Sequence, residues 1–329
     1  MKKRVLSGIR ATGRLHLGNY LGAVRGMLEL QNNAEYETLY CVVDLHAITT
    51  PYDNKTLPQN TRSVILDYLA CGIDPKKSIL YVQSDLADLI TQLAFYFSTT
   101  ITVASMQHLP TFKEKVKQYP QHTTMALLNY PILMAADILI YKASMIPVGI
   151  DQEPHLEVAR EIARKMNQLY GTDFPEPVRF RTKGEYIQSL TGEGKMSKSV
   201  EGSYINITDD LEVIKKKIAK VPTDSGMLGG PIPQVGGVAS LFSLAYMFGG
   251  AELHQKYVQS YKDKTIRYSD MKSDVSDTIY KELQPIQEKR KYYEENPQEV
   301  DAIIASGKEK AAEIARETVR DVKEKMGLG

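Results

Sequence analysis

The sequence of 329 residues contains no tryptophan and only two cysteines. Cys41 and Cys71 both stand among apolar residues, which indicates buried thiols in a reducing compartment rather than a disulfide or a metal site. No apolar run approaches the roughly 20 residues that a membrane-spanning helix requires. No segment of signal-peptide type follows the basic N-terminus, so we expect a cytoplasmic protein without membrane contact.

The chain also lacks a strong charge of either sign and lacks the motif Gly-x-x-x-x-Gly-Lys-Ser/Thr. The missing motif excludes a P-loop protein. A net charge of +1 favours no class of partner, so a nucleic-acid site would have to be a local basic patch. The length predicts two domains, or one large domain with an appendage.

A glycine-rich segment, residues 8–22, follows the apolar pair at residues 5–6 and precedes residues 20–31, whose apolar side chains have helical spacing. This pattern predicts a strand, a turn and a helix. Backbone N–H groups at a helix N-terminus bind phosphate, and His16 and Asn19 could donate hydrogen bonds to it. An ordinary helix start capped by Thr12 or Asn19 explains the same residues equally well.

A second motif, Gly-Lys-Met-Ser-Lys-Ser at residues 194–199, places Lys195 and Lys198 three residues apart in a loop rich in glycine and serine. Two ammonium groups suit a polyphosphate that gains negative charge as it leaves. The alternative is a solvated basic loop without a ligand.

Apolar segments at residues 38–43, 78–82 and 145–149 predict buried parallel strands, with a helix at residues 57–70 between the first two. The alternation of strands and helices predicts a Rossmann-like α/β sheet. His46 closely follows the first of these three segments, at the sheet edge where open α/β sheets bind ligands. A histidine that serves only packing is the alternative.

Residues 85–118 interrupt the alternation with one apolar and one charged segment of helical spacing, which predicts a helical insertion. Its apolar face packs either within the chain or against a partner subunit.

Asp137 is the only charge in the apolar helical segment 125–141. A buried carboxylate needs a partner, and it could accept a hydrogen bond from an indole N–H or from a phenol O–H. An aspartate that faces solvent is the alternative. Farther on, Gly149 precedes Asp151 and Gln152 at another helix start. Asp151 could bind ribose hydroxyls or cap the helix, Gln152 could reach an amino acid, and His155 is expected on the helix surface.

The remaining sequence is predicted to be mainly helical. Residues 211–220 form a helix with Asp209 as its cap and with Lys215, Lys216, Lys217 and Lys220 as a basic patch, for phosphate contact or only for solvation. Further helices are expected at residues 239–248, 251–261, 269–296 and 298–326, with Gly307 as a break.

The two motifs together resemble those of the class I aminoacyl-tRNA synthetases. Residues 16–19, His-Leu-Gly-Asn, are similar to their His-Ile-Gly-His, and residues 195–199 match their second motif letter for letter. Residues 43–49, 134–139 and 148–160 narrow the resemblance to the tryptophanyl-tRNA synthetases, over nearly the whole chain. Arg10 and Leu6 depart from the Gln and Phe of many bacterial members.

This resemblance implies that the chain activates L-tryptophan with ATP to tryptophanyl-adenylate and pyrophosphate, and then transfers tryptophan to tRNA(Trp). It implies Mg²⁺ bound with ATP and a homodimer joined through the insertion, about residues 85–125. It also implies a catalytic domain, residues 1–203, and an all-helical anticodon-binding domain, residues 204–329. A tyrosine-specific synthetase, or a regulatory paralogue that does not charge tRNA, is the alternative.

The resemblance also implies roles for individual residues. Catalysis is expected from His16, Asn19, Lys195 and Lys198, and no resident metal is expected. ATP would contact Arg10, Ala11, Thr12, Gly18, Asn19, Gly149, Ile150, Asp151, Ile187, Lys195, Met196, Ser197, Lys198 and Ser199. Tryptophan would contact Asp137, Met134, Ile138, Ile146, Val148, Gln152, His46, Leu6 and Gly8.

Overall fold

The structure is a computed structural model that describes residues 2–181, 187–198, 200–226 and 230–329. The chain divides into two compact units. Unit 1 comprises Met1–Gly13, Gly26–Lys183 and Asn296–Gly329, and unit 2 comprises Arg14–Arg25 and Gly184–Glu295. Each unit is therefore assembled from segments that are far apart in the sequence.

Unit 1 contains a sheet of five parallel strands in the order β3-β2-β1-β4-β5, which confirms the predicted Rossmann-like fold. The strands are β1 (Lys3–Arg10), β2 (Tyr36–Val43), β3 (Ser78–Val82), β4 (Met145–Ile146) and β5 (Val178–Arg179). The sequence did not predict β5, because Val178 stands outside any apolar run, whereas the equally short β4 lies in the apolar segment 145–149.

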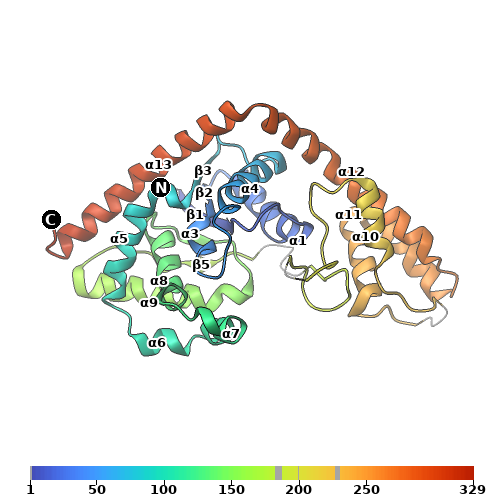
Figure 1. Ribbon diagram of the computed structural model, residues 1–329, viewed down its shortest axis with the longest axis horizontal. Helices are drawn as coiled ribbons and strands as arrows, with labels where there is room; N and C mark the ends of the chain where they lie inside the picture. Colours follow the sequence, from blue (N-terminus) through green and yellow to red (C-terminus); the bar gives the residue numbers. More distant parts are fainter. Residues whose placement is uncertain (1, 182–186, 199, 227–229) are drawn as a thin grey trace. The chain divides into compact units, whose positions relative to one another are not determined.

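Helices cover both faces of this sheet, as the consecutive buried residues in the middle of β1 and β2 require. Leu39 and Cys41 belong to the apolar cluster formed with α5, α8 and α9. Tyr40 points to the opposite face, where its hydroxyl donates to the backbone carbonyl of Met27 at 2.6 Å. The helices around the sheet are α2 (Arg25–Gln31), α3 (Asp44–Ala47), α4 (Leu57–Cys71), α8 (Met125–Leu139), α9 (Glu153–Tyr170) and α13 (Pro297–Lys325), shown in Figure 1.

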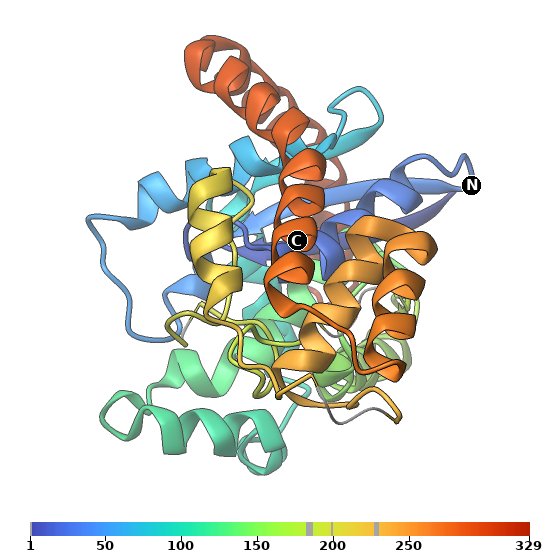
Figure 2. The same ribbon diagram turned by 90° about the vertical axis from the view of Figure 1, so that its right-hand side faces the viewer.

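The insertion is helical, as predicted. It contains α5 (Ala87–Ser98), α6 (Val103–His108) and α7 (Pro110–Gln118), with short 3₁₀ helices η2 (Gln83–Leu86) and η3 (Pro120–His122) at its two ends. Helix α5 packs against α8 and α13, and α6 and α7 lie side by side (Figure 2). No residue of α7 is buried, so this helix contributes little to the core of unit 1.

Helix α13 passes directly over the edge strand β3. Gly307 was expected to break this helix, but it lies inside it. A side chain at this position would collide with the backbone carbonyl of Leu80 in β3. The prediction was wrong because this glycine permits close packing of a helix on a strand rather than a turn.

Unit 2 is mainly helical. It contains α1 (Leu17–Asn19), the π-helical turn η1 (Tyr20–Val24), and the helices α10 (Leu211–Ala219), α11 (Gly236–Lys262) and α12 (Tyr268–Glu295). Helix α12 packs against both α10 and α11. Gly250 has a left-handed backbone, φ 72°, and interrupts α11 where the sequence predicts a break between two helices.

One predicted helix cap is displaced by a single residue. Asp210, not Asp209, caps α10, because its carboxylate accepts from the backbone N–H of Val213 at 2.8 Å. Asp209 instead accepts from the backbone N–H of Asn206 at 2.9 Å and from Lys217 at 2.6 Å.

The structure bears on the two cysteines and on membrane-spanning helices. Both cysteines are buried thiols without a disulfide, as predicted, and burial raises the pKa of Cys41. Within the described ranges, no helix combines the length and apolar character that crossing a membrane demands.

Candidate active site

The first motif forms a short helix start in unit 2. His16 is the N-cap of α1, where its Nδ1 accepts from the backbone N–H of Asn19 at 3.3 Å. In return, Asn19 Oδ1 accepts from the backbone N–H of His16 at 3.3 Å. This reciprocal pair is a capping box. Asn19 therefore takes part in capping, as one of the alternatives held, whereas Thr12 does not cap this helix.

The capping box determines which polar hydrogens of the motif are available to a ligand. Because His16 Nδ1 is an acceptor, the neutral ring carries its proton on Nε2. Because Asn19 Oδ1 is occupied, its amide NH₂ group points away from the helix backbone. Burial, together with the nearby Lys198 and Lys195, lowers the pKa of His16 to about 4. His16 and Asn19 thus offer two neutral donors at neutral pH.

The second motif adjoins the first within unit 2. The backbone N–H of Leu17 donates to the carbonyl of Ile205 at 2.9 Å, and the segment that follows residue 199 thereby runs beside the first motif. The same adjacency extends to Gly18, where a Cβ would lie 3.4 Å from Cβ of Met196 and 2.8 Å from the ring of His16. A larger residue than glycine would therefore displace the His16 ring.

The two lysines lie in a loop that is held by its backbone. Met196 is buried, and its backbone N–H donates to the carbonyl of Ile187 at 2.8 Å. The backbone N–H of Ser197 donates to the hydroxyl of Ser203 at 3.3 Å. Lys195 is exposed and Lys198 is half-buried. Their electrostatic effect on His16 places two cations near the neutral donors of the first motif. Ser199 lies outside the described residues.

Asp137 is buried in unit 1, as predicted, and both of its oxygens accept hydrogen bonds. His46 Nε2 donates to Oδ2 at 2.7 Å, and Gln83 Nε2 donates to Oδ1 at 2.7 Å. The alternative of a solvent-facing aspartate is therefore wrong. The contact of His46 with a ligand stays a prediction, because the bond to Asp137 also satisfies a histidine that binds no ligand. Gln83 was missed, although it follows β3 at the same sheet edge where His46 follows β2.

The apolar residues predicted for the tryptophan pocket belong to one cluster with Asp137's helix. Leu6, Ile138 and Ile146 are buried, whereas Met134 and Val148 are partly buried against the same cluster. Gly8 lies in β1, where a Cβ would meet Sγ of Cys41 at 2.8 Å and Cγ1 of Val43 at 2.8 Å. Gly8 therefore allows β1 to lie close to the side chains of strand β2.

His155 is buried, so its predicted place on the helix surface is wrong. Its Nδ1 donates to Gln152 Oε1 at 2.9 Å, and the hydroxyls of Tyr130 and Thr111 lie 2.6 Å and 2.8 Å from its Nε2. Burial, and next the charge of His46, lower its pKa to about 4. Neutral His155 thus holds Gln152 in place. No sequence pattern indicates this role, because the partners of His155 come from three separate elements.

The turn before α9, which includes η4 (Ile150–Gln152), presents an apolar side chain to solvent. Ile150 is 65% exposed, which is unusual for isoleucine, and the Asp151 carboxylate beside it accepts from Gln152 Nε2 at 2.8 Å. No side chain caps α9, so the alternative role of Asp151 as a cap is wrong. An exposed apolar surface next to a carboxylate suits a nucleoside.

The loop after β1 also belongs to unit 1. Arg10 and Thr12 are exposed, Ala11 is buried, and the backbone N–H of Thr12 donates to the carbonyl of Arg10 at 2.8 Å. Burial, and next the charge of Arg10, lower the pKa of Lys115 in α7. Arg10 and Lys115 therefore lie close enough to form a positive region beside β1.

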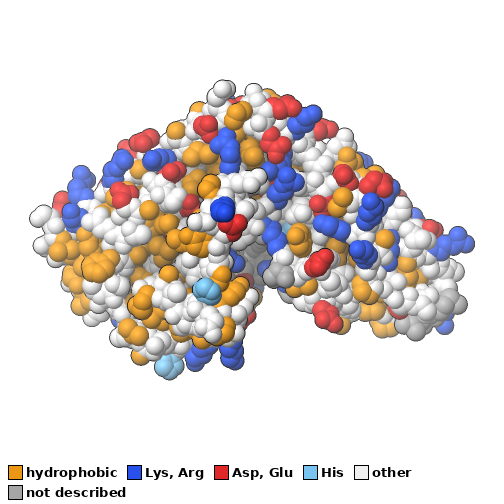
Figure 3. Space-filling view, viewed as in Figure 1, with side chains coloured by type: hydrophobic (Ala, Val, Ile, Leu, Met, Phe, Trp, Pro, Cys, Tyr) orange, Lys and Arg blue, Asp and Glu red, His pale blue; other side chains and the backbone are white. Residues whose placement is uncertain are grey.

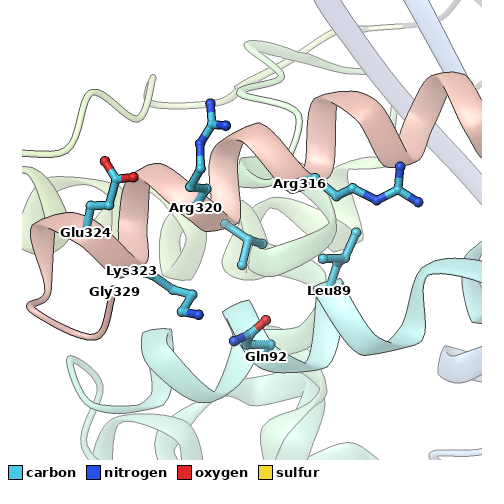
Figure 4. Close-up of a pocket in the computed structure, with 8 residues that line it drawn as sticks. Leu89, Gln92, Arg316, Arg320, Lys323, Glu324 and Gly329 are labelled. Atoms are coloured by element: carbon cyan, nitrogen blue, oxygen red, sulfur yellow. The ribbon is translucent and has the colours of Figure 1, made fainter.

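The predicted residues thus form two groups, one in each unit. Among the described residues, no cluster of three or more His, Cys, Asp or Glu side chains is arranged to hold a metal ion. A groove between α5 and α13 (Figure 4) contains no predicted site residue. It is lined by Leu89, Gln92, Arg316, Val319, Arg320, Lys323, Glu324 and Gly329.

The family model described as "tRNA synthetases class I (W and Y)" matches residues 1–284. A tryptophan–tRNA ligase of Helicobacter pylori (strain ATCC 700392 / 26695) is 40% identical over 331 residues, which cover 99% of this chain and 99% of that relative. One of Porphyromonas gingivalis is 37% identical over 327 residues, covering 98% and 99%. The crystal structure of tryptophanyl-tRNA synthetase from Campylobacter jejuni, complexed with ADP and tryptophan, is similar with a TM-score of 0.87 at 30% identity, covering 99% and 100%.

Proposed function

The chain belongs to the class I tRNA synthetases of the tryptophan and tyrosine group, and on this premise we propose that it joins L-tryptophan to tRNA at the expense of ATP. The tryptophan carboxylate attacks the α-phosphorus of ATP, and pyrophosphate leaves. A ribose hydroxyl at the 3′ end of tRNA then attacks the carbonyl carbon of the adenylate, and AMP leaves. Neither step requires a covalent nucleophile from the protein.

The observation that carries this proposal is the adjacency of the two motifs in unit 2. Neutral donors on His16 and Asn19 lie near the cations of Lys195 and Lys198. In the proposed mechanism, the first pair donates hydrogen bonds to the α-phosphate as its charge grows. The two lysines stabilise the pyrophosphate that leaves. Catalysis is then positioning and charge stabilisation, as in other phosphoryl-transfer reactions.

In the same proposal, tryptophan binds to the residues of unit 1. Asp137 accepts a hydrogen bond from the indole N–H, beside the apolar side chains of Leu6, Met134, Ile138, Ile146 and Val148 and close to Gly8. Gln152, held by His155, contacts the amino-acid part of the substrate. A carboxylate whose partner is missing is costly, so a phenylalanine side chain would be rejected.

For ATP, we propose the contact residues that the family resemblance implies. They are Arg10, Ala11, Thr12, Gly18, Asn19, Gly149, Ile150, Asp151, Ile187 and residues 195–199. Support comes from the exposed Ile150 beside Asp151 and from the positive region at Arg10. Mg²⁺ is proposed to arrive with ATP and to neutralise part of the phosphate charge.

For tRNA, we propose contact with helical residues of the 204–329 segment, with catalysis assigned to residues 1–203. Within the basic patch of α10, Lys217 pairs with Asp209 at 2.6 Å and Lys215 pairs with Asp277 at 3.2 Å. These pairs lower the positive charge that the patch offers to phosphate. Lys216 and Lys220 are therefore the stronger candidates for phosphate contact.

A homodimer is proposed through the insertion. Phe95 is 70% exposed, Val103 60% and Met125 65%, and all three lie between residues 85 and 125. Figure 3 shows hydrophobic side chains gathered on the face of unit 1 that includes α5. Exposed apolar groups of this size favour burial against a second copy. We further propose that the protein acts in the cytoplasm, where tRNA and ATP are available.

The decisive experiment is the exchange of labelled pyrophosphate into ATP, measured with each of the twenty amino acids in turn. Exchange with tryptophan alone, followed by charging of tRNA, is the expected result. Exchange with tyrosine would keep the chemistry but overturn the assignment of an indole N–H as the donor to Asp137, because a phenol O–H can donate to the same carboxylate. No exchange with any amino acid in folded protein would favour a regulatory paralogue.

A further inference from the structure

Gln83 of unit 1 is a buried polar residue to which the proposed mechanism assigns no role. It is the first residue after β3 and has no exposed surface. A fully buried glutamine is uncommon and must satisfy both ends of its amide. Both ends of the Gln83 amide form hydrogen bonds, and these bonds define the orientation of the amide.

The amide orientation of Gln83 is determined by a backbone group. Gln83 Oε1 accepts from the backbone N–H of Leu45 at 3.1 Å. An N–H cannot donate to an NH₂ group, so the oxygen of the amide must face Leu45 and the nitrogen must face Asp137. The Nε2 of Gln83 then donates to Asp137 Oδ1 at 2.7 Å.

Asp137 is in consequence held at both oxygens by residues from two neighbouring strand ends. His46 stands after β2 and Gln83 after β3, whereas Asp137 itself belongs to α8. A carboxylate has about four acceptor positions, and these two bonds leave others for a ligand. The two bonds therefore fix the rotation of the Asp137 carboxylate, and they do not occupy all of its acceptor positions.

We propose that Gln83 is a positioning residue for amino-acid selection, which fixes the Asp137 carboxylate so that a free lone pair faces the indole N–H. This inference rests on the proposed role of Asp137 as the acceptor for tryptophan. It differs from a purely structural role in one respect. The contribution of Gln83 to binding must depend on the presence of the substrate N–H.

The test compares tryptophan with β-(benzothiophen-3-yl)alanine, in which sulfur replaces the indole N–H. Both are assayed by pyrophosphate exchange with the full chain and with Gln83→Met. Methionine has a similar volume and no donor, and the Leu45 N–H retains Asp44 Oδ1 at 3.1 Å. We expect Gln83→Met to raise KM for tryptophan roughly tenfold, and KM for the sulfur analogue less than about twofold. KM for ATP should stay unchanged.

An equal rise in KM for both substrates would show that Gln83 only supports the fold, and it would overturn the proposal. The matched control is Gln31→Met in the same unit. Gln31 also bridges a backbone N–H, that of Asp74 at 2.8 Å, and an acceptor, the carbonyl of Gly72 at 3.2 Å. This control should leave the ratio of the two KM values unchanged.

Gln83→Glu provides a second variant if Gln83→Met does not fold. Two adjacent carboxylates share one proton, and a protonated Glu at position 83 would restore a donor to Asp137. KM for tryptophan should then be near the wild-type value at low pH and rise as the shared proton is lost. The same rise for the sulfur analogue would overturn the proposal.

Asp137→Asn separates this inference from the function on which it rests. If Asp137→Asn leaves the preference for tryptophan over the sulfur analogue unchanged, the role of Asp137 is wrong. If Asp137→Asn abolishes that preference while Gln83→Met leaves it intact, only the inference about Gln83 is wrong. The expected outcome is that both variants reduce the preference.

Discussion

His16 Nδ1 accepts the backbone N–H of Asn19 at 3.3 Å, and this single contact assigns the proton of the imidazole to Nε2. Nδ1 caps a helix. In the proposed mechanism Nε2, on the opposite side of the ring, donates to the α-phosphate, so His16 would have two roles. Removing the side chain tests the two roles together, so their effects need separate readouts.

His16→Ala should lower kcat for pyrophosphate exchange by about 100-fold, because a donor to the developing phosphate charge is lost. KM for ATP should change less than about threefold. Asp210→Ala is the matched control, since it removes the cap of α10 in the same unit. It should lower Tm without a comparable loss of kcat. A similar kcat loss in both variants would mean that His16 acts only as a cap.

The buried histidines should make stability depend on pH in a defined window. His155 has a pKa of about 4 in the folded chain and an ordinary value near 6.5 when unfolded. The unfolded state therefore binds more protons between these values, so stability is complete above pH 6.5 and falls as pH decreases towards 4. For one such histidine, the free energy of unfolding should decrease by about 1 kcal/mol when the pH falls from 7.5 to 5.5.

The measurement is urea unfolding of the wild-type chain and of His155→Gln at both pH values. The variant lacks the titrating group, so the stability difference between the two proteins should narrow by about 1 kcal/mol at pH 5.5. A difference that stays constant with pH would show that His155 titrates normally. The pKa of His16, also lowered to about 4, contributes equally to both proteins and cancels.

Lys198→Ala should slow adenylate formation far more than it weakens ATP binding. We expect a loss of roughly 100-fold in kcat, because the ammonium group is assigned to the charge of the leaving pyrophosphate. The readout is a pair of measurements, exchange kinetics and equilibrium binding of ATP. Lys291→Ala, an exposed lysine in the same unit, is the control. Equal losses in rate and binding would assign Lys198 to ground-state binding only.

Phe95→Asp should convert a dimer into monomers, because a carboxylate replaces an aromatic ring at the proposed interface. Mass in solution can be measured by light scattering after size-exclusion chromatography. Tyr246→Asp is the matched control, since Tyr246 is 60% exposed on α11, outside the insertion. If Phe95→Asp leaves the mass unchanged, the dimer does not use this face.

The fold could largely be predicted from the sequence, because apolar strands and helical spacing extend over many residues. Strand β5 was missed because its two residues lie outside any apolar run. The cap at Asp210 was missed because Asp209 is an equally good capping residue by type. Gly307 was misassigned because sequence alone does not distinguish a glycine that ends a helix from one that lets a helix approach a strand.

The candidate site was predicted less completely than the fold. His16, Lys195 and Asp137 were chosen for residue type and context, and the structure gives each of them polar or charged neighbours. Gln83 and His155 could not be identified in the same way. Their importance depends on which side chains they contact, and these contacts form only after distant segments have come together.

The packing of α13 on β3 also bears on how the protein is made. Strand β3 is an edge of the sheet, and Gly307 brings the helix against its backbone. Residues 78–82 are synthesised long before residues 297–325, so the edge of the nascent sheet stays uncovered until α13 has been made. An exposed strand edge invites pairing with other chains. Premature termination anywhere before α13 should therefore yield a product that aggregates rather than a smaller working enzyme.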